Sequence, residues 1–412
     1  MGANPTSTAR DAAGLPRSES AHAPAAFDVT PRTRLVFGAG SISRLGSILD
    51  GIPCARVLLV TDAGIVRAGH VDRVAKALGG QDRRIHLVFS GVRENPDTVC
   101  VDECLAAARE FRPDAIVGLG GGSSMDTAKA CNFLLTNGGR MQDYWGVGKA
   151  TRPMLPFVAI PTTAGTGSEC QSAALIADAE THMKMACLDP KAAACAAILD
   201  PELTVSQPVG VTACTGMDAI AHAVETAVTT KRHPISWMYS REAFALLVPG
   251  FPKVLANPSD LDARGRMLLG AALAGMAIEQ SMLGAAHAAA NPLTARFGTV
   301  HGVAVGLMLP HVVRFNATDP GARDIYAELG ASVGLARSGA SEGAVAEAVA
   351  SRIESLLDAA GMPRDLVKLG VDRKAIPTLA EEAARQWTAG FNPIRVEAAD
   401  FVRLYEAAFA SG

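Results

Sequence analysis

Short apolar runs alternate with amphipathic stretches over the first half of the chain. The four clearest runs are Arg56–Asp62, Ile85–Phe89, Asp114–Gly120 and Phe157–Ile160. Their length and apolar character predict buried parallel strands. Between the runs, Val71–Leu78 and Val99–Glu110 have helical patterns, the second with alanine and leucine on one face. Such alternation predicts a parallel sheet with helices on both faces.

The pattern changes after about Pro208, where long stretches rich in Ala, Leu and Glu predict helices. These stretches are Ala213–Thr229, Ile235–Leu247, Ala263–Leu283, Ser341–Ala360, Ile376–Trp387 and Ala398–Ala410. Proline and glycine punctuate them, as in Pro249–Pro252. We therefore expect an α/β domain over residues 27–207 and an all-helical domain over 208–412. Residues 1–26, which are rich in Ala, Ser, Pro, Thr and Arg, are expected to form a disordered tail.

Composition narrows the class of protein. Of 412 residues, 49% are hydrophobic and 19% charged, which indicates a globular chain with large cores. The net charge of −3 gives no reason to expect a nucleic acid partner. The apolar runs are too short to span a membrane. Eight scattered cysteines without a Cys-x-x-Cys pair or a signal peptide predict reduced thiols in a cytoplasmic protein.

Four residues suggest a metal site. Asp218 and His222 are four residues apart, so on a helix they project from the same face. His287 and His301 follow in a stretch rich in glycine and alanine. One carboxylate and three imidazoles suit a divalent first-row ion such as Fe²⁺ or Zn²⁺ better than Ca²⁺.

A glycine-rich loop, Gly120–Asp126, follows a predicted strand and opens a helix. Glycines allow close approach of a ligand, and free N–H groups at a helix start favour a diphosphate, although an ordinary tight turn would look the same. Asp62 ends an earlier strand. An acid there can bind an adenosine ribose and repel a 2′-phosphate, or it can cap a helix.

A second polar loop, Pro161–Glu169, also follows a strand and contains four hydroxyl residues and two glycines. It could line a polar ligand, or its hydroxyls could bond to their own backbone.

Taken in order, these segments resemble the iron-containing (group III) alcohol dehydrogenases. The resemblance rests on Gly120–Lys129, Pro161–Glu169, Gly216–His222, and His287 with Val300–Gly302, and it covers roughly Phe27 to Leu404. It implies an N-terminal Rossmann-like parallel-sheet domain, a C-terminal helical domain (a dehydroquinate synthase-like architecture) and an active site between them.

The resemblance also implies site residues. The metal ligands would be Asp218, His222, His287 and His301. Gly121, Gly122 and Ser123 would hold the diphosphate, Asp126 would stabilise that turn, and Asp62 would bind the adenosine ribose and select NAD. Further cofactor contacts would come from Asn95, Thr162, Thr163, Thr166 and Lys184.

One position departs from the family pattern. Many members have a second histidine four residues after the equivalent of His287, near the nicotinamide, but this chain has Asn291. An amide cannot act as a general acid or base near neutral pH. The departure therefore concerns the proton route or the substrate, while the metal ligand set is complete.

The sequence thus predicts a metal-dependent NAD(H) oxidoreductase that interconverts an alcohol and its aldehyde or ketone. The metal would be Fe²⁺ or, alternatively, Zn²⁺. A lyase or cyclase like dehydroquinate synthase is one alternative, but Leu283–Val303 contains only Arg296 to bind a phosphorylated acid. A non-catalytic protein retaining the fold is another. The resemblance and the β-rich Arg34–Phe37 suggest a homodimer formed through N-terminal strands.

Overall fold

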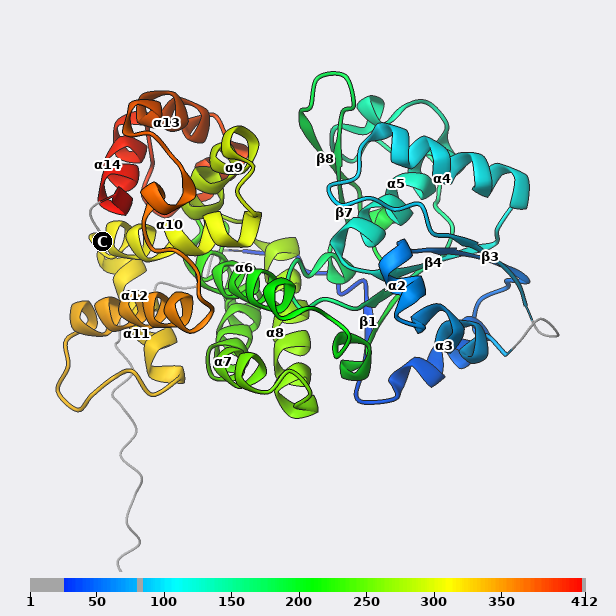
Figure 1. The fold of residues 1–412 in the computed structure, drawn as a ribbon, viewed down its shortest axis with the longest axis horizontal. Helices are drawn as coiled ribbons and strands as arrows, with labels where there is room; N and C mark the ends of the chain where they lie inside the picture. Colours follow the sequence, from blue (N-terminus) through cyan, green and yellow to red (C-terminus); the bar gives the residue numbers. More distant parts are fainter. Residues whose placement is uncertain (1–25, 80–83, 410–412) are drawn as a thin grey trace, which may run out of the picture.

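The computed structural model describes residues 26–79 and 84–409, which form a sheet-containing lobe and a helical lobe (Figure 1). This arrangement confirms the predicted fold class. The predicted tail, residues 1–26, lies outside the described residues except for its last position.

The first lobe is built on a parallel sheet of six strands in the order β1-β9-β6-β4-β2-β3. In chain order the strands are β1 (Arg34–Phe37), β2 (Arg56–Val60), β3 (Ile85–Phe89), β4 (Ala115–Gly120), β6 (Phe157–Pro161) and β9 (Ala196–Leu199). The four predicted strands are all present. β9 was not expected, although it lies between β1 and β6 in the sheet.

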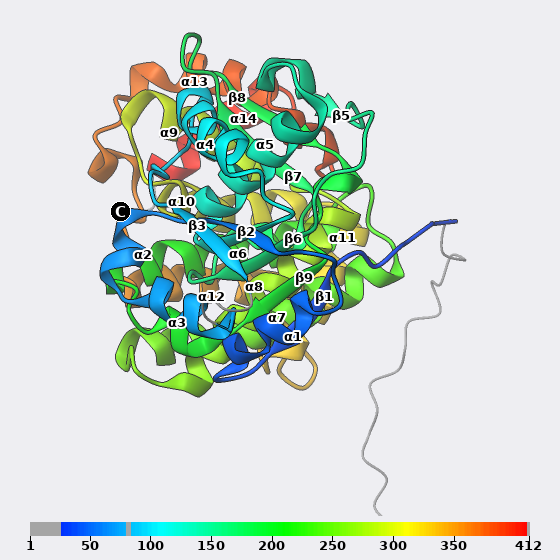
Figure 2. The same cartoon turned by 90° about the vertical axis from the view of Figure 1, so that its right-hand side faces the viewer.

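Helices cover both faces of this sheet. Along β2, Val57 and Leu59 point into one apolar cluster, whereas Leu58 and Val60 point into another. The first cluster includes α1 (Leu45–Leu49) and α3 (His70–Ala77), and the second includes α4 (Thr98–Phe111) and α5 (Gly122–Asn137). Figure 2 shows these two pairs on opposite sides of the strands. Burial on both faces explains why the strands are continuously apolar.

A small second sheet projects beside the first (Figure 1). Its order is β5-β8-β7, with β5 (Gly146–Val147) parallel and β7 (Ala173–Ala177) antiparallel to β8 (Lys184–Leu188). This sheet was not expected from the sequence. It matters for the site because it places Lys184 at the start of β8.

The second lobe begins with α6 and contains helices throughout. They are α6 (Val209–Val228), α7 (Pro234–Ala256), α8 (Leu261–Gln280), α9 (Ala285–Phe297), α10 (His301–Asn316), α11 (Pro320–Ser332), α12 (Glu342–Ala359), α13 (Ile376–Ala384) and α14 (Ala398–Phe409). Six of these were predicted, whereas α9, α10 and α11 were not. The first lobe also contains the short helix α2 (Ala63–Arg67), which follows β2.

The expectation that proline interrupts the helix at Pro249–Pro252 is wrong, because α7 continues through both prolines to Ala256. An interior proline costs about 3 kcal/mol. Phe251 and Val254 are fully buried, and Phe251 packs where a side chain on Gly216 of α6 would stand. Burying two such side chains contributes roughly 3 to 6 kcal/mol, against roughly 6 kcal/mol for the two prolines.

Among the described residues, no single helix is long and apolar enough to cross a membrane. The helices α8 and α9 pass such a test only as a pair, and they are bent by 104° where they meet. Most residues of both helices are buried inside the fold, as expected for core helices.

Candidate metal and dinucleotide site

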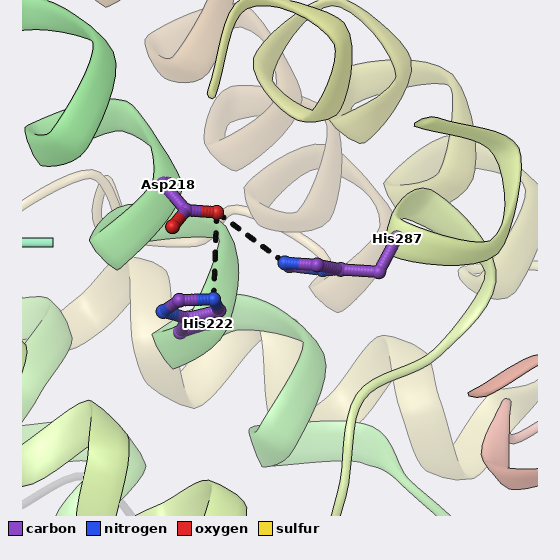
Figure 3. Close-up of side chains that lie close together, drawn as sticks. All are labelled: Asp218, His222 and His287. Carbon is purple, nitrogen blue, oxygen red and sulfur yellow. Dashed lines mark ion pairs between the residues drawn. The ribbon is translucent and has the colours of Figure 1, made fainter. Parts of the chain in front are cut away.

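Helix α6 presents Asp218 and His222 one turn apart, as the spacing predicts, and both are buried. Nε2 of His222 lies 3.4 Å from Oδ1 of Asp218. Helix α9 brings His287 to the same place, with its Nε2 3.3 Å from that oxygen. The rings of His222 and His287 are stacked with centroids 4.9 Å apart. Figure 3 shows the two imidazoles approaching one oxygen of Asp218.

His301 is the first residue of α10 and stands at the open side of this cluster. Its Nε2 lies 3.7 Å from Oδ1 of Asp218. The His301 side chain is 36% exposed, against 9% or less for the Asp218, His222 and His287 side chains. The structure therefore brings all four predicted residues together. Three of the side chains are buried, and that of His301 is partly exposed.

Electrostatics keep the carboxylate of Asp218 ionised. Burial alone would raise its pKa, but the neighbouring histidines outweigh burial and hold the pKa well below its usual value. Burial also acts to lower the pKa of His287, yet the carboxylates of Glu225 and Asp218 raise it to about 9. The carboxylates of Asp218 and Glu225 thus favour a positive charge at this position.

The donor set fits a divalent metal ion. Oδ1 of Asp218 and Nε2 of His287 are buried, yet neither has a hydrogen-bond partner. Asp218, His222 and His287 offer ligand atoms within 4.8 Å of one another. A tetrahedral ion bound about 2.1 Å from nitrogen and oxygen ligands separates those ligands by roughly 3.4 Å. The observed separations from Oδ1 of Asp218, 3.3 to 3.7 Å, agree with that geometry.

Glu225 contacts the cluster through Nδ1 of His287 and was not expected from the sequence. This buried residue is bonded to Nδ1 of His287 and also accepts the backbone N–H of Ala286 at 2.7 Å. A signal was available, because Glu225 follows His222 by three residues on the same helix and so shares its face.

The glycine loop lies at the carboxyl end of β4 and the start of α5. Gly120 has φ 144°, a conformation that side chains rarely adopt, and Gly121 is the N-cap of α5 without a side chain to cap it. The first N–H groups of α5, including that of Ser123, therefore belong to an uncapped helix start. Such an end is suited to an anion.

The second loop, residues 161–169, packs directly against the glycine loop. The N–H of Thr162 donates to the carbonyl of Gly120 at 2.9 Å. A Cβ on Gly122 would stand 2.8 Å from Thr166, and one on Gly121 would stand 3.3 Å from Thr163. Close packing of the two loops thus leaves little room for a side chain at either glycine.

The same second loop reaches α6 on its other side. A Cβ on Gly165 would lie 2.6 Å from the Cβ of Thr215, which is one turn before Asp218. Residues 161–169 therefore bridge the glycine loop and the helix that carries the acidic ligand candidate.

A buried polar network fixes this bridge. Asp126 accepts a hydrogen bond from Oγ of Ser168 at 2.8 Å. Nζ of Lys129 donates to the carbonyl and the hydroxyl of Ser168 and to the carbonyl of Ala173, at 2.6 to 2.9 Å. Asp126 thus joins α5 to the second loop.

Asp62 acts as the N-cap of α2. Its Oδ1 accepts the N–H groups of Gly64 and Ile65 at 2.7 and 3.1 Å. Its Oδ2 lies 3.5 Å from the place where a Cβ on Gly120 would stand. The capping role and the predicted cofactor role are therefore compatible, because the second oxygen faces the glycine loop.

The remaining predicted residues occupy separate positions. Asn95 is exposed, with φ 50°, in the segment between β3 and α4. Lys184 is exposed at the start of β8. Asn291, one turn beyond His287 on α9, is half-buried and donates to Oε1 of Gln386 at 3.0 Å.

Comparison with known proteins finds two family models that match the sequence, both from one family. The family model described as iron-containing alcohol dehydrogenase matches residues 31–201. The model described as the C-terminal part of the Fe-containing alcohol dehydrogenase family matches residues 212–409.

Individual relatives match along nearly the whole chain. Alcohol dehydrogenase 4 of Schizosaccharomyces pombe is 35% identical over 87% of this chain and 84% of its own length. NAD-dependent methanol dehydrogenase of Bacillus methanolicus is 34% identical over 90% of this chain and 97% of its own length. The crystal structure of a 1,3-propanediol oxidoreductase superposes with a TM-score of 0.90 at 32% identity, covering 93% of this chain and all of that one.

Proposed function

Because the chain belongs to the iron-containing alcohol dehydrogenase family, we propose that it interconverts an alcohol and its aldehyde or ketone, using a divalent metal and NAD(H). The observation that carries this proposal is the loop 161–169, which contacts both the glycine loop and α6. It joins a dinucleotide-type loop to a buried cluster of one carboxylate and three imidazoles. Relatives named as dehydrogenases support this reading over the lyase or cyclase alternative.

In this proposal Asp218, His222, His287 and His301 hold the metal, which is Fe²⁺ or alternatively Zn²⁺. When bound, such an ion supplies Lewis-acid stabilisation of the substrate oxygen. The four side chains contribute one negative charge in a largely buried setting. The partial exposure of His301 leaves the substrate an approach from that side.

The first lobe holds the dinucleotide. Gly121, Gly122 and Ser123 at the start of α5 offer backbone N–H groups to its diphosphate, where the helix dipole also favours negative charge. Asp62 faces the adenosine ribose. The other contacts in this proposal are Asn95, Thr162, Thr163, Thr166 and Lys184, while Asp126 and Lys129 keep the second loop in place.

Asn291 cannot relay a proton, and its amide is bonded to another amide, that of Gln386. We propose that the alcohol proton is instead lost to solvent at the exposed side of the cluster, beside His301.

We further propose a cytoplasmic homodimer acting on a small alcohol or aldehyde, with no nucleic acid or membrane partner. β1 supports the dimer, because it is an edge strand of the sheet and Phe37 at its end is 48% exposed. An edge strand presents unpaired backbone groups that a second copy can bond.

The direct test is metal analysis of the purified protein together with an NADH-absorbance assay. We expect about one Fe²⁺ or Zn²⁺ per chain, loss of turnover with a chelator and recovery when the metal is restored. A panel of short alcohols and aldehydes, assayed with defined metal, would identify the substrate. No bound metal and no turnover with any member of the panel would contradict the proposal.

Cofactor preference should depend on Asp62. We expect Asp62→Ser to lower the NAD-over-NADP ratio of kcat/KM roughly 10- to 100-fold, because like-charge repulsion costs several kcal/mol and about 1.4 kcal/mol is tenfold. Serine is a good N-cap, so the change removes the charge while keeping the start of α2. Steady-state kinetics with both cofactors measures the ratio, and an unchanged ratio would show that Asp62 only caps the helix.

A further inference from the structure

Glu225 is a buried carboxylate with two separate bonds to the segment that carries His287. Only 2% of the residue is exposed. Its Oε1 accepts the backbone N–H of Ala286 at 2.7 Å, and Nδ1 of His287 donates to its Oε2. One side chain on α6 therefore fixes the ring of a metal-ligand candidate on α9 and the backbone of the residue before it.

The first backbone N–H groups of α9 need hydrogen-bond acceptors from outside the helix. Its N-cap is Gly284, which has no side chain to accept the first N–H groups of the helix. The N–H of Ala285 is accepted by Oδ1 of Asn392 at 3.3 Å, and that of Ala286 by Glu225. A Cβ on Gly284 would stand 3.1 Å from Asn392 and 3.2 Å from Glu225, so a larger residue would crowd both acceptors.

The bond to Nδ1 also decides which nitrogen of His287 can bind a metal. With the Nδ1 proton directed at Glu225, the lone pair of the neutral ring is on Nε2. That nitrogen is buried, has no hydrogen-bond partner and lies 3.3 Å from Oδ1 of Asp218. The ring is thus turned so that its free nitrogen faces the cluster.

We propose that Glu225 is a positioning residue that prepares His287 for the metal by fixing its tautomer, its ring orientation and the start of α9. This inference rests on the proposed function, since it assumes that the cluster binds a metal. A carboxylate behind a metal-binding imidazole also increases the basicity of the ligand nitrogen. Glu225 lies on the Nδ1 side of His287, opposite the nitrogen that faces Asp218.

The test is Glu225→Gln in the full-length protein. An amide of nearly the same shape keeps one oxygen and replaces the other with an NH2 group, which cannot accept. Because Ala286 and His287 are bound by different oxygens of Glu225, the variant loses one of the two bonds in this geometry. We expect Co²⁺ and Zn²⁺ to bind 10- to 100-fold more weakly, the range typical for loss of such an outer partner. Competition against a chromophoric chelator, starting from metal-free protein, measures both affinities without any turnover.

Thermal unfolding separates positioning from a purely structural role. If Glu225 positions His287, the rise in Tm caused by added Zn²⁺ should be smaller in Glu225→Gln than in the wild type. An equal loss of Tm with and without Zn²⁺, at unchanged affinity, would overturn the proposal. Should the glutamine variant fail to fold, Glu225→Asp, which keeps the charge but is one methylene shorter, should show the same weakened binding.

Ser240→Ala is the matched control. The buried hydroxyl of Ser240 bonds to Thr226 of α6 at 2.8 Å and to the carbonyl of Ser236 at 2.9 Å. It bonds to no ligand side chain in the observed hydrogen bonds, and Thr226 reaches His222 only at its backbone carbonyl, at 2.7 Å. Its removal should lower Tm and leave metal affinity unchanged. A wild-type protein that binds no metal would contradict the proposed function, whereas a wild type and a Glu225→Gln variant with equal affinity would contradict this inference alone.

Discussion

Replacement of Asp218 by alanine is expected to abolish metal binding and to lower kcat/KM by at least about 10³-fold. Lewis-acid stabilisation is worth several kcal/mol, and each 1.4 kcal/mol is about a factor of ten in rate. Asp218 supplies the oxygen on which all three imidazoles converge, at 3.3 to 3.7 Å. Without it the ion would lose its only charged ligand among the four. Metal content and steady-state kinetics on the purified variant measure the two effects.

The same variant should still bind NADH, because the glycine loop belongs to α5 and packs on residues 162–166 rather than on Asp218. Fluorescence titration with NADH checks this separation. Asp262→Ala is the control for removing an aspartate, since Asp262 is exposed at the start of α8 and pairs only with Arg266 in the bonds observed. Full metal content in Asp218→Ala would refute the assigned ligand set, even if activity fell.

Local spacing was enough to predict the half of the cluster that lies on one helix. Asp218 and His222 are one turn apart, and α6 forms where the composition predicts it. His287 and His301 were grouped with them on residue type and on the family resemblance, because no pattern within the sequence states which helix approaches α6. Neither α9 nor α10 was predicted as a helix.

The feature that the sequence did not predict is the break between α8 and α9. The sequence predicts a helix to Leu283, but α8 ends at Gln280 and the chain turns by 104° into α9. Met282 has φ 143°, a strained conformation for a residue other than glycine. Local propensity cannot anticipate this turn, because it is held by tertiary bonds such as that from Ala286 to Glu225. The turn is what carries His287 to Asp218.

Gly302→Ala should have the second large effect, through the position of His301. The Cβ of an alanine at this position would stand 2.1 Å from the carbonyl oxygen of Cys214 and 2.8 Å from its carbon, both in the backbone of α6. Backbone atoms cannot move aside as a flexible side chain would, so the start of α10 must shift away from α6. Overpacking of this kind costs about 1 to 3 kcal/mol or more. His301, the preceding residue, would move out of reach of the other three ligand candidates.

We therefore expect Gly302→Ala to bind metal at least about tenfold more weakly, a loss of roughly 1.4 kcal/mol, and to lower Tm. Gly210→Ala is the matched control, because Gly210 lies in the first turn of α6 and a Cβ there would meet nothing within 4 Å. That change should leave metal affinity unchanged and should stabilise the protein slightly, since alanine restricts the unfolded chain more than glycine does. Metal affinities that are equal in the two variants would mean that His301 does not contribute to the site. A selective loss in Gly302→Ala would show that close packing of α10 on α6 completes the ligand set.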